Sequence, residues 1–250
     1  MRDQLDILAF SPHPDDAELG CGGSLLLAAD RGQSTAVADV TNGECATRGS
    51  VEKRNNEKAK ASELLGLCNR FSLGLLDTKV GHDPDHRLPL IELIRSTRPR
   101  VVLAPYWHDR HPDHEAVGRL VREACFYAGV AMVGSQKPFR PERVYYYMIH
   151  TPFTPSFVVD ITPVWDRKMT VLHAYGSQFF DNGSEQQGKT SLSGGEFLKF
   201  YKSRSIYFGA MIGTSYGEPF FSITPVPASR IPGISALRSS PDLLPPYCPI

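Results

Sequence analysis

The segment Leu-Asp-Ile-Leu-Ala-Phe-Ser-Pro-His-Pro-Asp-Asp, residues 5–16, sets the pattern that the rest of the chain repeats. Its apolar run at residues 5–10 stops at a proline-rich turn, which is typical of a buried strand in a parallel sheet. A helix is predicted over residues 19–30, with Gly32 at its end. A strand, a short polar turn and a helix in this order form the first part of a βαβ unit.

The same alternation continues downstream. Further strands are predicted at residues 35–40, 70–73, 101–104, 144–148 and 157–161. Helices are predicted at residues 52–65, 88–97, 114–127, 164–175 and 196–206. Strands that alternate with helices of about 10 to 15 residues indicate a doubly wound sheet. We therefore expect an α/β fold, with a Rossmann-like three-layer α/β/α architecture and a mostly parallel sheet.

Length and composition suit one large domain. The chain has 250 residues, of which 41% are hydrophobic, enough to bury a sizeable core. We expect a single domain over residues 1–225 and a proline-rich tail over residues 226–250. Residues 177–195 are polar and glycine-rich, which predicts a loop or lid.

Charge and hydropathy exclude several partners. The chain has 27 basic and 27 acidic residues and no basic stripe, so no nucleic-acid partner is expected. No apolar run approaches the roughly 18 residues that span a bilayer, so no membrane association is expected. The charged N-terminus lacks the apolar stretch of a signal peptide, which predicts a cytoplasmic protein. Five scattered cysteines without a Cys-x-x-Cys pair argue against a disulfide framework or a cysteine zinc site.

Chemistry-bearing residues gather directly after the first predicted strand. His13, Asp15 and Asp16 lie within four residues of one another. Helix capping would explain one of the aspartates, because a carboxylate accepts hydrogen bonds from the first helical N–H groups. Capping does not explain a second aspartate or a histidine between Pro12 and Pro14. The flanking prolines restrict the turn and fix the direction of the histidine.

A second cluster follows the predicted strand at residues 101–104. Residues 108–114 read His-Asp-Arg-His-Pro-Asp-His. His111 and His114 are three residues apart, so one helical turn would place them on the same side. Pro112 suits the first turn of the helix that follows. Ligands bind at the carboxyl ends of the strands in such sheets, so we expect the two clusters to meet at one edge.

Together these side chains predict a catalytic metal site. Two imidazoles and one carboxylate, with a fourth position left for water, are typical of catalytic Zn²⁺, and the same donors also accept Fe²⁺, Co²⁺ or Mn²⁺. A bound divalent ion activates water, and a spare carboxylate can serve as general base. The residues alone leave His111 and His114 interchangeable, and likewise Asp15 and Asp16.

Residues 12–18, Pro-His-Pro-Asp-Asp-Ala-Glu, and residues 111–114, His-Pro-Asp-His, resemble the two signature motifs of the LmbE/PIG-L family of zinc-dependent N-deacetylases. Arg54-x-x-Glu57 and Tyr175-Gly-Ser-Gln-Phe179 also resemble that family, and the resemblance covers residues 5–220. The segment at residues 208–220 is similar to the branch that deacetylates N-acetylglucosaminyl malate in bacillithiol biosynthesis.

The resemblance implies a role for each site residue. It implies three metal ligands: His13, Asp16 and His114. It implies three catalytic residues: Asp15 as general base, His111 as the group that stabilises the oxyanion or protonates the amine, and Asp113 as the residue that orients His111. Arg54 is implied as a substrate contact, and we interpret Asp109 and Arg110 as supporting the site or recognising an acidic group of the substrate. Phe197 aligns where some relatives have a tyrosine, and Tyr201 is expected to be a core aromatic.

The expected function is zinc-dependent hydrolysis of the N-acetyl group of an N-acetylglucosamine conjugate, with N-acetylglucosaminyl malate as the particular substrate. The alternatives are an amidase of a thiol conjugate, a deacetylase of another acylated small molecule, and a metal-dependent phosphoesterase. A nucleotide-binding module is disfavoured, because Leu25 occupies the third glycine position of the segment that starts at Gly20. The resemblance also predicts a homo-oligomer, with a hexamer as in relatives.

Overall fold

A computed structural model describes residues 4–81, 83–179, 190, 193 and 195–227 of the chain. Within this part, seven strands form one sheet in the order β3-β2-β1-β4-β5-β7-β6. The strands are β1 (Ile7–Ser11), β2 (Thr35–Thr41), β3 (Asn69–Leu75), β4 (Val101–Pro105), β5 (Arg143–Tyr147), β6 (Phe157–Asp160) and β7 (Gly217–Phe221). The first five pair in parallel, whereas β7 runs antiparallel to both β5 and β6.

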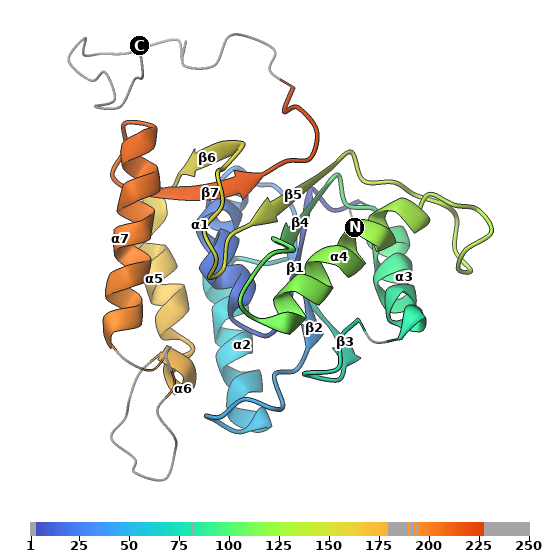
Figure 1. The fold of residues 1–250 in the computed structure, drawn as a ribbon, viewed down its shortest axis with the longest axis horizontal. Helices are drawn as coiled ribbons and strands as arrows, with labels where there is room; N and C mark the ends of the chain where they lie inside the picture. The colour runs from blue at the N-terminus through green and yellow to red at the C-terminus, as the bar shows by residue number, and fades with distance from the viewer. Residues whose placement is uncertain (1–3, 82, 180–189, 191–192, 194, 228–250) are drawn as a thin grey trace.

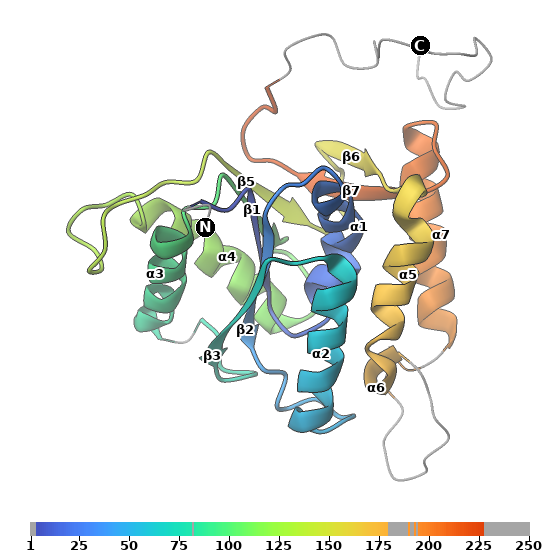
Figure 2. The same cartoon turned by 180° about the vertical axis from the view of Figure 1, so that it is seen from behind.

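Helices cover both faces of this sheet (Figures 1 and 2). The α-helices are α1 (Asp16–Asp30), α2 (Val51–Leu65), α3 (Arg87–Thr97), α4 (Pro112–Tyr127), α5 (Trp165–His173), α6 (Gly176–Phe179) and α7 (Gly195–Met211). Two 3₁₀ turns, η1 (Pro84–His86) and η2 (Thr162–Val164), precede α3 and α5. One layer contains α1, α2, α5 and α7, and the other contains α3 and α4. The predicted three-layer α/β/α fold with a mostly parallel sheet is confirmed.

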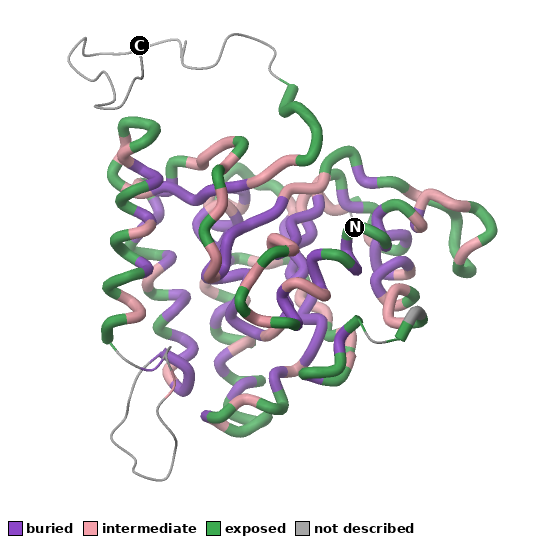
Figure 3. The backbone as a smooth tube through the Cα atoms, in the orientation of Figure 1, coloured by how far each residue is buried: buried purple, intermediate pink, exposed green. Residues whose placement is uncertain are grey.

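Alternation along the strands builds two separate cores. In β1, Ala9 packs into the layer with α1, while Leu8 and Phe10 pack into the layer with α3 and α4. Successive side chains of a strand point to opposite faces, so a strand buried on both faces must be apolar throughout. The tube in Figure 3 accordingly shows the central strands buried along their length.

Several helix ends follow from single residues. At the start of α2, the Ser50 hydroxyl accepts a hydrogen bond from the Lys53 N–H. At its end, Gly66 has φ +67°, the left-handed conformation that glycine adopts without a Cβ clash. The helix predicted from residue 19 in fact starts at Asp16, so the first motif runs directly into α1.

The strand β7 was not predicted from the sequence. It makes the antiparallel part of an otherwise parallel sheet. Its five residues include Gly217 and Pro219, which are both depleted in strands. Pro219 pairs only with Val158 of β6, while the pairing with β5 is made by Phe220 and Phe221. The missing N–H of the proline therefore removes no hydrogen bond to β5.

Other expectations have mixed outcomes. The loop predicted from residue 177 is wrong for residues 177–179, which belong to α6, and most of residues 180–194 lies outside the described residues. Residues 228–250 of the expected tail also lie outside them, so the boundary at residue 225 stays a prediction. In the described ranges, no helix is both long and apolar enough to cross a membrane.

Candidate active site

The two motifs meet because β1 and β4 are neighbours. The pairs Ile7–Val101 and Ala9–Leu103 align the two strands in parallel, so both motifs leave the sheet at the same edge. The ring of His13 lies 4.8 Å from that of His111 and 5.4 Å from that of His114, centroid to centroid. The expectation that the two clusters share one edge is confirmed.

His13, Asp16 and His114 form a buried group that could hold a metal ion. Asp16 Oδ2 lies 3.1 Å from His13 Nδ1 and 3.2 Å from His114 Nε2. Tetrahedral zinc with bonds of about 2.0–2.1 Å places its donor atoms about 3.3 Å apart, close to these two distances. Burial would raise the pKa of Asp16, but the charge of His114 and hydrogen bonds to both histidines hold it well below its usual value.

Asp15 lies beside this group in a strained backbone conformation. Its φ of 129° is rare for a residue with a side chain, and it makes no side-chain cap to α1. The carboxylate instead accepts a hydrogen bond from Arg54 Nη1 at 3.2 Å. Burial raises the pKa of Asp15 to about 7, against the attraction of Arg54. A carboxyl group that titrates near neutral pH suits a general base.

His111 stands at the start of α4, half-buried. Its Nδ1 accepts a hydrogen bond from the Asp113 backbone N–H, and its ring stacks on His114 at 4.6 Å. Burial and the neighbouring charge of His114 lower the pKa of His111. A neutral imidazole with Nδ1 as acceptor carries its proton on Nε2, so that atom is a hydrogen-bond donor.

The Asp113 carboxylate points to a different histidine from the one that the resemblance implied. Its Oδ2 lies 3.2 Å from His13 Nε2, and its backbone N–H donates to His111 Nδ1. Hydrogen bonds to Asp113 and Asp16 outweigh the effect of burial and raise the pKa of His13 well above its usual value.

Asp109 faces His114, the other histidine of this group. Its Oδ1 lies 3.4 Å from His114 Nδ1, and its Oδ2 accepts the backbone N–H groups of His150 and Thr151. The His150 ring stacks on His114 at 5.4 Å. This placement beside His114 agrees with a supporting position for Asp109, one of the two roles that the sequence left open for it.

Sequence reasoning missed Asp77, which follows β3. Its Oδ1 lies 3.3 Å from His13 Nε2, and only 7% of the residue is exposed. The strand before it, β3, is separated from β1 by β2, so the sequence does not indicate that Asp77 lies near His13. A single aspartate in a loop also matches no motif for a functional site. The available clue was its position a few residues after a predicted strand.

The implied substrate contacts lie at different depths. Arg54 is buried, with Nη1 bonded to the Pro14 carbonyl and to Asp15, and with no hydrogen-bond partner at Nε. Arg110 is exposed in the loop before α4. Tyr201 is a core aromatic, as expected, and donates to the Leu19 carbonyl.

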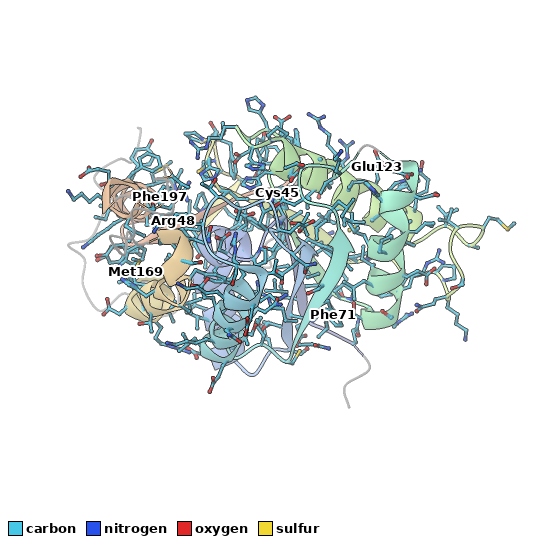
Figure 4. All side chains as sticks on the ribbon, turned by 90° about the horizontal axis from the view of Figure 1, so that it is seen from below. Cys45, Arg48, Phe71, Glu123, Met169 and Phe197 are labelled. Carbon is cyan, nitrogen blue, oxygen red and sulfur yellow. The ribbon has the colours of Figure 1, made fainter. Side chains whose placement is uncertain are left out.

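Two features flank the centre. The ring of Phe197 in α7 lies 6.2 Å from the ring of His150, centroid to centroid. A cavity of about 590 Å³ is lined by Thr78, Asp113 and residues of α4 as far as Glu123. Figure 4 shows Cys45, whose N–H binds Asp77, between Phe197 on one side and Glu123 on the other. Asp113, which faces His13, also lines this cavity, so the cavity lies beside the centre.

The histidine–aspartate group lies at the carboxyl edge of a Rossmann-like sheet, which is where open α/β sheets bind their ligands. The family model described as PIG-L, GlcNAc-PI de-N-acetylase, matches residues 8–125. The chain is 30% identical to a Bacillus cereus protein named probable N-acetyl-α-D-glucosaminyl L-malate deacetylase 2. The similarity covers 69% of this chain and 83% of that protein. The chain belongs to the PIG-L (LmbE) family.

Similarity to other members extends over most of the chain. A diacetylchitobiose deacetylase of Thermococcus kodakarensis is 28% identical over 87% of this chain and 82% of that protein. The solved structure of a conserved protein from Thermus thermophilus has a TM-score of 0.84 and 40% identity, and covers 93% of this chain and 100% of that one. A 4-oxalmesaconate hydratase of Pseudomonas putida is 27% identical over 70% of this chain and 74% of that protein. Similar proteins therefore have names that describe more than one reaction.

Proposed function

We propose that this protein is a zinc-dependent N-deacetylase that removes the acetyl group from an N-acetylated amino-sugar conjugate. The observation that carries this proposal is the pairing of a group that fits zinc, His13, Asp16 and His114, with a buried carboxylate beside it. Amide hydrolysis needs a polarised carbonyl, an activated water and a proton for the departing amine, and the site offers a group for each.

When bound, zinc supplies Lewis-acid polarisation of the acetyl carbonyl and lowers the pKa of water. The Asp15 carboxylate takes a proton from the attacking water. Arg54 holds that carboxylate in place through the hydrogen bond at 3.2 Å. His111 Nε2–H donates to the oxyanion, an interaction typically worth about 3 to 4 kcal/mol when one donor is removed. The proton held by Asp15 then passes to the amine nitrogen as the C–N bond breaks.

The amino-sugar part of the proposal rests on the relatives. Their names give three different N-acetylated sugars: diacetylchitobiose, N-acetylglucosaminyl malate and 2'-N-acetylparomamine. All three carry an acetylated amine on a sugar, and they differ in what is attached to it. We therefore propose an N-acetylated amino sugar as the substrate class, with N-acetylglucosaminyl malate as one member to test. The cavity beside Asp113 offers room for the attached group.

A second candidate function is hydration of a small unsaturated acid, which the similarity to the hydratase favours. The phosphoesterase alternative is disfavoured, because two-metal phosphate chemistry needs a second ligand set. Every potential metal group among the described residues includes His13 or His114, so none is independent of the first.

The deciding experiment is a fluorescamine assay for released amine. Zinc-loaded enzyme is incubated with diacetylchitobiose, N-acetylglucosaminyl malate, N-acetylparomamine and free N-acetylglucosamine. We expect release from at least one of them, with one metal per chain by plasma emission. No release from any, with zinc bound and with 4-oxalmesaconate consumed in an ultraviolet assay, would establish the hydratase instead.

A further inference from the structure

We propose that Asp77 is a positioning residue that holds His13 in the orientation needed to bind the metal. This inference rests on the proposed function, since it takes His13 as a metal ligand. It adds a third segment, the turn after β3, to a centre that the two motifs do not complete alone.

The two nitrogens of His13 face different carboxylates. Nδ1 lies 3.1 Å from Asp16 Oδ2, on the side of the metal group. On the far side, Nε2 lies 3.3 Å from Asp77 Oδ1 and 3.2 Å from Asp113 Oδ2. Carboxylates at Nε2 favour the tautomer that carries its proton there, which leaves the lone pair of Nδ1 for the metal.

Asp77 is fixed independently of His13. Its Oδ2 accepts the backbone N–H of Cys45 at 3.0 Å, and its own N–H donates to Glu44 Oε1 at 2.8 Å. These contacts tie the turn after β3 to the loop after β2. The carboxylate therefore reaches His13 from a turn that is held by two hydrogen bonds, as expected of a group that sets the direction of a ring.

The next residue, Thr78, shows that this turn is held against a local conformational cost. Its φ of +66° is rare for a β-branched residue. In this conformation its N–H donates to Asp113 Oδ2 at 2.9 Å, the same oxygen that faces His13. One turn thus supplies an acceptor to His13 and a donor to Asp113, and such strain persists where the surrounding structure fixes it.

The test measures zinc affinity in the full-length chain. We expect Asp77→Ala to weaken zinc binding about 10–100-fold, the usual effect of losing an outer carboxylate. Asp77→Asn keeps an oxygen acceptor and should lose less than the alanine variant. Affinity is obtained by competition with a chromogenic chelator, and far-ultraviolet circular dichroism of the metal-free proteins checks that each variant folds.

The control is Asp85→Asn, which removes an exposed carboxylate from the segment that follows the same turn and should leave zinc affinity unchanged. Folded Asp77 variants that bind zinc as tightly as the parent would overturn the inference, and so would variants that lose turnover at unchanged affinity. Failure of the proposed function has a different signature, namely a parent protein that binds zinc but deacetylates no substrate.

Discussion

The centre gathers more negative charge than its own side chains balance. Four aspartates surround two histidines: Asp16, Asp77, Asp109 and Asp113 around His13 and His114. Buried carboxylates are costly unless they are paired, so a divalent cation in their midst is electrostatically favoured. Without a metal, protons on the histidines take over part of this compensation, and metal binding must displace them.

Zinc binding is therefore predicted to release protons and to tighten as the pH rises. Burial favours the neutral form of His114, but Asp16 and Asp109 outweigh it and raise its pKa to about 9. The folded protein therefore holds this proton until the pH rises through about 9, and the stability that it contributes is complete below about 6.5, the ordinary pKa of histidine. Zinc affinity should then increase about tenfold per pH unit for each displaced proton in this window.

Titration calorimetry in two buffers of different ionisation enthalpy measures the protons released at pH 7.5. Equal apparent binding enthalpies in both buffers would contradict the prediction, as would a zinc affinity that is flat between pH 6.5 and 8.5. A zinc-chelating peptide titrated in the same buffers provides the reference for the metal itself.

Asp15→Asn is predicted to keep the metal but to lose about 10²–10⁴-fold in kcat, because the amide cannot accept the proton of water. Metal content by plasma emission and turnover by amine release test the two halves. Asp166→Asn, an exposed aspartate on α5, is the control and should match the parent in both. If Asp15→Asn lost the metal while Asp16→Asn retained it, the roles of the two aspartates would be reversed.

At the scale of elements, a buried ion pair ties the antiparallel strand to two helices. Glu218 of β7 accepts the N–H groups of Gly23 and Ser24 in α1 at 2.7 Å each, and it pairs with Lys168 of α5. Lys168 also donates to the Leu19 carbonyl at 2.9 Å. Both charged side chains are almost fully buried, so each depends on the other.

Glu218→Ala is predicted to destabilise the fold by about 3 to 5 kcal/mol, because it leaves Lys168 buried without a counter-charge. For a chain of this size each kcal/mol corresponds to roughly 2–4 °C, so the melting temperature should fall by about 10 °C. Thermal unfolding followed by circular dichroism measures the change. The control Glu142→Ala breaks an exposed ion pair with Arg100 and should lower the free energy of unfolding by less than about 1 kcal/mol. Equal losses of stability in the two variants would contradict the prediction.

Elements and site residues are predictable from the sequence where the interactions that fix them join residues close together in the chain. The alternation of β1, α1 and β2 was predicted because apolar periodicity is local. The meeting of His13 with His114 was predicted because parallel strands share a carboxyl edge. The strand β7 was not, since Pro219 tolerates its place only through the particular neighbours that it has. Nor was Asp77, whose significance comes from a contact across 64 positions in the chain, which composition cannot reveal.

At the scale of the whole molecule, one helix carries large apolar side chains that the described part of the chain leaves exposed. Phe200, Tyr207 and Met211 of α7 are 53%, 63% and 41% exposed. Their spacing places them along one side of the helix. The family resemblance predicts a homo-oligomer, and we propose that a second copy of the chain covers this side of α7.

We predict that the protein elutes with a mass several times the 27.7 kDa of one chain in light scattering. Tyr207→Glu combined with Met211→Glu should shift it toward the monomer, because charge on an apolar interface opposes association. Asp166→Asn again provides the neutral comparison. A monomer at micromolar concentration in the parent protein would contradict both the expected hexamer and this use of α7.

The position of β7 also has a consequence for how the chain matures. Strand β7 lies between β5 and β6 but follows them by more than fifty residues. Until residues 217–221 have left the ribosome, β5 has an open edge and Lys168 lacks its carboxylate. An unpaired edge is a template for association between chains, so nascent or truncated chains should be the species that chaperones bind. Pairing of β7 with β5 and β6 is thus expected to close the open strand edge and to lower the tendency of the chain to associate.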